Sequence, residues 1–77
     1  MTEEQIKIVS DEIKIQRFKN KIKQEDIAEV LKISRETYRK LENNPDKISV
    51  KQALAISSTL NWNLLDFITS CSLQNAK

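Results

Sequence analysis

The absence of glycine constrains the fold of this chain more than any other feature of its sequence. None of the 77 residues is glycine, and Pro45 is the only proline. Glycine takes left-handed backbone at the least cost, so other residues must make the tight turns. With so few helix breakers, and with abundant Lys, Glu, Ile and Leu, the chain is expected to be all-α.

Length and cysteine content indicate how the chain is organised and what stabilises it. A chain of this length forms one domain, near the lower limit for folding without cross-links. Cys71 is the single cysteine and histidine is absent, so neither an internal disulfide nor a metal or other cofactor is expected. We interpret Cys71 as an ordinary reduced thiol, with a reactive or dimer-linking thiol as the alternative.

The N-terminal segment indicates where the protein works. MTEEQIKIVS is acidic, whereas a signal peptide begins with positive charge. No apolar run approaches the length that spans a membrane. We therefore expect a cytoplasmic protein without a membrane partner.

Charge is unevenly distributed, although the net charge is only +2. Residues 1–16 carry two lysines against four acidic residues, whereas residues 17–47 carry nine Lys or Arg against six Asp or Glu. A local anion-binding surface requires such a basic segment, but a merely solvated charged surface has the same composition.

Apolar residues at helical spacing predict five helices. The first runs from about residue 3 to 20, or forms two shorter helices that meet near Ser10, and Thr2 with Gln5 resembles a capping box. Further helices are expected over residues 23–32, after Ser34, after Ser49 and over residues 63–68, and NNPDK is expected to form a turn. The segment after the fifth helix, TSCSLQNAK, is expected to be frayed. The expected inward residues are Ile27, Val30, Leu31, Tyr38, Leu41, Val50, Ala53, Leu54, Ser57, Leu60, Leu64, Phe67 and Ile68.

Residues 24–43 are expected to form a short helix, a tight turn and a second helix whose outer face is free. Four long polar side chains fall on that face: Arg35, Glu36, Arg39 and Lys40. A helix fits the major groove of DNA, and these side chains carry donors and acceptors that suit base edges. Taken alone, the same charged face is more simply interpreted as plain solvent-facing surface.

Two segments, QEDIAEVLKISRETYRKLE and SVKQALAISSTLNWNLLDFI, resemble the Cro/repressor (XRE-like) helix-turn-helix family. The resemblance covers roughly Ile13 to Ile68. It implies a compact five-helix repressor-like domain, with the helix-turn-helix at the second and third helices and double-stranded DNA as partner. It divides the chain into an N-terminal helical extension (residues 1–12), a DNA-binding domain (residues 13–70) and a C-terminal tail (residues 71–77).

The resemblance also implies roles for individual residues. Four side chains are implied as base readers: Arg35, Glu36, Arg39 and Lys40. Four others are implied as phosphate or flanking contacts: Lys23, Gln24, Thr37 and Asn43. Arg17 and Glu42 match a structural ion pair that ties the first helix to the end of the third without touching DNA.

The chemistry of these side chains supports the assignments separately. Arg35 or Lys40 can donate to guanine O6 and N7, and Glu36 can accept from cytosine N4. Near phosphates, Glu36 is repelled unless it binds cytosine or pairs with a neighbouring cation. Three further lysines are candidates for phosphate contact, although each alone is more simply interpreted as solvated: Lys19, Lys21 and Lys23.

Three positions depart from the family by lacking its glycines: Lys32, Asn44 and Asn61. Asparagine enters the left-handed region at little cost, whereas lysine loses about 1–2 kcal/mol there. We therefore expect Lys32 to be a strained turn residue. Trp62, the only tryptophan, is expected to pack in the core or an interface rather than to stack on a base.

The sequence lacks the parts of an enzyme, because no nucleophile has a plausible base partner and no glycine-rich phosphate loop is present. We expect a transcriptional regulator, most simply a repressor of phage, prophage or plasmid type, bound as a homodimer to an inverted-repeat operator. The fifth helix is the favoured dimer surface, with the tail and the N-terminal extension as alternatives. The competing hypothesis is a protein-interaction module on the same fold, such as a small antitoxin or an adaptor, and a protein antagonist is left open.

Overall fold

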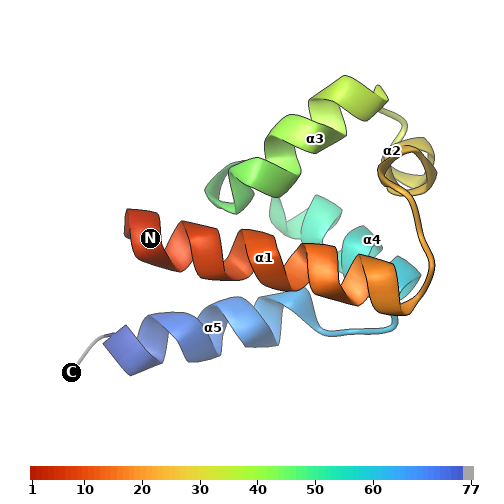
Figure 1. Cartoon of the computed structure of the whole chain (residues 1–77). Coiled ribbons are helices and arrows are strands. Elements are labelled where there is room, and N and C mark those ends of the chain that lie inside the picture. The colour runs from red at the N-terminus through yellow and green to blue at the C-terminus, as the bar shows by residue number, and fades with distance from the viewer. Residues whose placement is uncertain (76–77) are drawn as a thin grey trace.

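The computed structural model describes residues 1–75, with side chains up to Cys71. These residues form helices and no strand, which confirms the expected all-α fold of five helices (Figure 1). The turn expected at NNPDK is present and contains a 3-10 turn, η1. The elements are α1 (Glu3–Lys19), α2 (Gln24–Leu31), α3 (Arg35–Asn43), η1 (Pro45–Lys47), α4 (Val50–Leu60) and α5 (Leu64–Asn75).

Helix α1 is continuous, so the alternative of two helices meeting near Ser10 is wrong. Its start is the expected capping box. The Gln5 N–H donates to Thr2 Oγ1 at 3.1 Å, and the Thr2 N–H donates to Gln5 Oε1 at 2.7 Å. These bonds satisfy backbone donors that the first helical turn leaves without partners.

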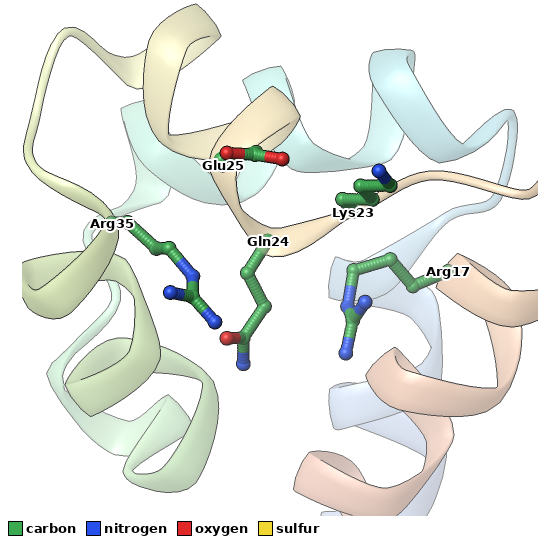
Figure 2. A pocket seen from close by; sticks show the side chains of 5 residues that line it. All are labelled: Arg17, Lys23, Gln24, Glu25 and Arg35. Atoms are coloured by element: carbon green, nitrogen blue, oxygen red, sulfur yellow. The ribbon is translucent and has the colours of Figure 1, made fainter.

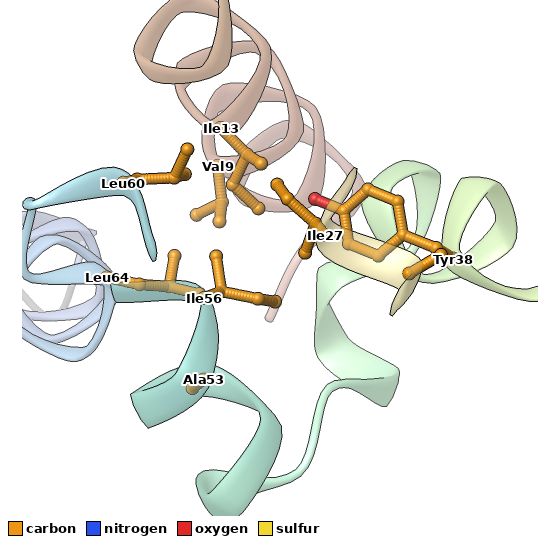
Figure 3. Packing of buried hydrophobic residues seen from close by; sticks show 9 residues of the cluster. Val9, Ile13, Ile27, Tyr38, Ala53, Ile56, Leu60 and Leu64 are labelled. Carbon is orange, nitrogen blue, oxygen red and sulfur yellow. The ribbon is translucent and has the colours of Figure 1, made fainter. Parts of the chain in front are cut away.

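The core lies where α1, α2, α3, α4 and the start of α5 converge (Figure 3). Burying each large apolar side chain there contributes about 1.5–3 kcal/mol, which fixes how α2 and α3 sit on the rest of the domain. The buried cluster consists of Val9, Ile13, Ile27, Ala28, Tyr38, Ala53, Ile56, Leu60 and Leu64.

Three residues expected in the core lie on the surface instead: Val30, Val50 and Leu54. Helix α4 turns its Ala53, Ile56 and Leu60 side inward, so its buried stripe is rotated away from Val50 and Leu54. Both stripes have helical spacing and share Ala53 and Leu60, and the sequence pattern therefore did not separate them. In α2, Ile27 and Ala28 are buried and Leu31 is half-buried.

Three helices end in the same way, with a left-handed residue that is not glycine. Lys21, Lys32 and Asn61 have φ of 55°, 59° and 51°. In each case the next N–H bonds back five residues, as in a Schellman motif: Ile22 to Arg17, Ile33 to Ala28 and Trp62 to Ser57. The strain expected at Lys32 is therefore present, and a second left-handed lysine, Lys21, was not anticipated.

Asn44 does not adopt the left-handed conformation that its alignment with a family glycine suggested. Its φ is −131°. Pro45 follows it, and a residue before proline is held in the extended range of φ by the pyrrolidine ring. Asn44 instead closes α3 through its side chain, whose Nδ2 donates to the Lys40 carbonyl at 3.1 Å.

Helix α5 extends to Asn75, well past the expected end at residue 68, so the prediction of a frayed segment is wrong as far as the structure describes it. The Asp66 N–H donates to Asn63 Oδ1 at 3.0 Å, and Cys71 is buried. Trp62 packs on the core beside Phe67, as expected, with ring centroids 5.5 Å apart. No helix in the described residues is long and apolar enough to cross a membrane.

Candidate nucleic-acid interface

Helix α3 stands at one side of the molecule, across the end of α2 (Figure 1). Ser34 caps it as expected, because Ser34 Oγ accepts from the Thr37 N–H at 3.0 Å and donates to Thr37 Oγ1 at 2.8 Å. Tyr38 and Glu42 point inward and are buried. The opposite face of α3 is therefore left to solvent.

That outer face carries all four residues implied as base readers, and all four are exposed: Arg35, Glu36, Arg39 and Lys40. Glu36 and Arg39 form an ion pair, with Arg39 Nη2 and Nε donating to the carboxylate at 2.5 and 3.2 Å. The hydrogen bond and charge of Arg39 lower the pKa of Glu36, while Glu36 raises the pKa of Arg39. At neutral pH Glu36 is thus an ionised acceptor whose charge a neighbouring cation compensates.

A surface pocket of about 470 Å³ opens between the end of α1 and the first turns of α2 and α3 (Figure 2). Three cationic side chains and one carboxylate line it, together with the Gln24 amide. The free N–H groups and positive dipole end of α2 lie at the same place, and both favour an anion. The lining residues are Arg17, Lys23, Gln24, Glu25 and Arg35.

Glu42 binds two of the side chains that line the pocket, Arg17 and Gln24. Its buried carboxylate accepts from Arg17 Nε and Nη2, both at 3.1 Å, and from Gln24 Nε2 at 3.2 Å. Arg17 Nη1 also donates to the Ile22 carbonyl at 3.2 Å. Arg17 and Glu42 therefore form an ion pair between α1 and α3, while Gln24 Nε2 keeps a second hydrogen with which to donate.

The remaining predicted contacts are placed less uniformly. Lys23 lines the pocket, whereas Lys19 and Lys21 are exposed outside its lining. Thr37 uses its hydroxyl to accept from Ser34, and Asn43 is exposed at the last position of α3. None of these positions conflicts with a flanking contact, but of these residues only Lys23 lines the pocket.

The structure adds two features that the sequence did not predict: a carboxylate in the lining of the pocket, and a buried hydroxyl on Tyr38, whose inward position was expected. Glu25 lines the pocket, although the helix dipole alone is enough to explain an acidic residue in the first turn of α2. Tyr38 is fully buried, and burial, followed by the neighbouring Glu42 carboxylate, raises its pKa well above the usual range. Within the described residues no group has the geometry of a hydrogen bond to its hydroxyl, although the Glu42 carboxylate lies near it. Nothing in the local sequence marked Tyr38 as more than an apolar position.

Two short helices that cross steeply, the second with a free charged face, are the arrangement of a helix-turn-helix domain (Figure 1). Comparison with protein families agrees, since the Helix-turn-helix family model matches residues 13–67. The chain belongs to this family, and its resemblance to the Cro/repressor (XRE-like) group is confirmed; it is a DNA-binding regulator of the helix-turn-helix class. Searches of curated proteins and of solved structures found no match to the chain.

Proposed function

We propose that this protein is a sequence-specific transcriptional repressor that binds double-stranded DNA with α3 in the major groove. The observation that carries the proposal is the joint exposure of Arg35, Glu36, Arg39 and Lys40 on one helix face beside the anion-binding pocket. A non-enzymatic, cytoplasmic repressor that covers a promoter is the simplest protein of this kind. Residues 13–70 are its DNA-binding unit.

Phosphate contacts set the register of such a complex. Lys23 and the second hydrogen of Gln24 Nε2 face the pocket at the start of α2, where the helix dipole also attracts a phosphate. Glu25 opposes a phosphate there, so the two cations Arg17 and Arg35 around it are needed to keep the pocket attractive to anions. Arg17 supplies charge only, because Glu42 and Ile22 already bind its guanidinium.

Base contacts supply the sequence preference. Arg35 and Lys40 offer donors for guanine, and the Glu36 carboxylate offers an acceptor for cytosine N4. Arg39 balances the Glu36 charge in the free protein, and in the groove it is released to donate to a phosphate or a guanine. A homodimer on an inverted repeat doubles the few base pairs that one α3 helix reads.

The proposal is tested by following backbone amide signals by NMR while a mixed-sequence duplex is added at low salt. We expect the largest shifts at the starts of α2 and α3 and on the outer face of α3. Lys51, an exposed lysine of α4, serves as the control position. Shifts spread evenly over all exposed lysines would leave only nonspecific charge attraction, and no shifts would remove DNA as the partner.

The alternative of a protein-interaction module is favoured by one observation. Val30, Val50 and Leu54 are exposed apolar residues on α2 and α4. In the same titration, DNA-induced shifts that avoid α3, or none at all, would make this apolar surface the first place to search for a protein partner.

A further inference from the structure

Helix α1 has two apolar faces, and the fold uses one of them. Val9 and Ile13 point into the core and are fully buried. Ile8, Ile15 and Phe18 are 43%, 46% and 72% exposed. Spacings of seven and three residues bring these three side chains to one side of the helix, away from Val9 and Ile13.

This exposed stripe extends beyond the region that α1 shares with the helix-turn-helix family. The family match begins at residue 13, whereas α1 begins at Glu3 and carries Ile8 in the additional turns. The phosphate contacts proposed above do not account for the stripe, because apolar side chains have no hydrogen-bond donor or positive charge for a phosphate. Arg17 lies 5.3 Å from the Phe18 ring centre and covers part of that side chain only.

We infer that this face of α1, rather than the fifth helix favoured from the sequence, packs antiparallel against the same face of a second copy of the chain. The charges of the helix favour that direction, because its first turn carries Glu3 and Glu4 and its last turn carries Lys19. When Ile8 lies opposite Ile15 of the second copy, Glu4 lies opposite Lys19 of the second copy. The apolar and the ionic contacts thus fall into one register, and the two-fold repeats each of them.

The same arrangement suits an operator-binding dimer, and in this respect the inference rests on the proposed function. Two identical antiparallel helices are related by an axis that is perpendicular to both and runs between them. Helices α3 and α5 lie on opposite sides of α1 (Figure 1). A rotation about such an axis places the α3 helices of both copies on the same side of the dimer, where a single duplex can contact both.

One acidic residue opposes this pairing and makes it easier to test. Asp11 is exposed, lies between Ile8 and Ile15 in sequence, and falls close to the two-fold axis, near Glu12 of the second copy. Lys14, one turn further along, offsets part of that repulsion. Asp11→Asn is therefore expected to tighten the dimer, a gain that a folding defect does not mimic.

The experiment is sedimentation equilibrium of the full chain without DNA. Ile15→Asp is expected to weaken dimerisation at least about tenfold, because two apolar contacts are lost for each dimer. Leu54→Asp is the matched control, since Leu54 is 58% exposed on α4, away from the stripe. Equal weakening by both variants, no effect of Ile15→Asp, or a monomeric native protein would overturn the inference.

Charge reversal identifies the register. Glu4→Lys and Lys19→Glu should each weaken the dimer about fivefold, as for a pair of exposed ion pairs, and the double variant should recover it. Additive weakening in the double variant would exclude the antiparallel register. A native dimer with these properties that selects no DNA would refute the proposed function alone, whereas a monomer that still selects DNA would refute the pairing alone.

Discussion

Glu42 is the residue on which the polar contacts of the interface converge. Its buried carboxylate binds Arg17 of α1 and Gln24 of α2 while it belongs to α3. A buried charge with two such partners is stable only while they remain in place. Glu42 therefore couples the packing of three helices to the position of the pocket residue Gln24.

Arg17→Met should be severely destabilising, by about 3–5 kcal/mol, because it leaves the buried Glu42 charge without its cation. Urea denaturation measures the loss. The control is Arg39→Met, which breaks the exposed Glu36 pair and should change stability by less than about 1 kcal/mol. Similar losses of stability in both variants would show that the buried ion pair stabilises the fold no more than the exposed one.

Tyr38→Phe should stabilise the protein by about 1 kcal/mol, because it removes a buried hydroxyl that lacks a hydrogen bond. The pH dependence gives a second test. Since the pKa of Tyr38 is raised in the folded state, the unfolded chain alone loses this proton above about pH 10, and native stability should fall there. Thermal melts from pH 8 to 11 should show a steeper decline for the native protein than for Tyr38→Phe; parallel declines would contradict the assignment.

Among the secondary-structure elements, three helices end at a residue with left-handed backbone that is not glycine. Each left-handed residue is followed by a large side chain that packs against the core, namely Ile22, Ile33 or Trp62. Packing of these residues holds the backbone in a conformation that the lysines disfavour. The helix-turn-helix crossing is thus maintained by the apolar residue after the turn rather than by the turn residue.

Lys32→Gly and Lys21→Gly should each raise the free energy of unfolding by about 1 kcal/mol, because glycine removes the steric penalty at positive φ. Asn61→Gly should gain less, since asparagine tolerates this region better. Denaturant titration of the three variants tests the order. A loss of stability at Lys32 would mean that its side chain contributes more than its backbone strain removes.

The sequence predicted where helices begin more accurately than which of their sides are buried. Capping residues such as Thr2, Ser34 and Ser49 located helix starts correctly, because a cap depends on neighbours within one turn. The buried side of α4 and the length of α5 depend on contacts with other helices, which spacing alone does not specify. At the site, helical spacing placed Arg35, Glu36, Arg39 and Lys40 on one exposed face, whereas Glu25 entered the pocket through tertiary packing.

At the scale of the whole molecule, one edge brings together the α3 face and the pocket beside α2. Arg35 belongs to both, so its substitution should affect sequence preference as well as affinity. Arg35→Ala should weaken operator binding by about 1–3 kcal/mol and relax one base position, whereas Lys23→Ala should weaken all duplexes similarly and reduce the salt slope by about one. Binding to single-base operator variants at several salt concentrations separates them. A uniform loss for Arg35→Ala would make it a phosphate contact.

Whether this chain reads DNA sequence is decided by a selection, in which the 77-residue chain binds duplexes from a random pool. The bound fraction is followed from low to moderate salt. We predict enrichment of an inverted repeat with half-sites about one helical turn apart, and binding of that repeat should outlast the binding of random duplex as salt rises. Retention of no sequence above background at any salt concentration would contradict the proposal that the chain reads DNA sequence.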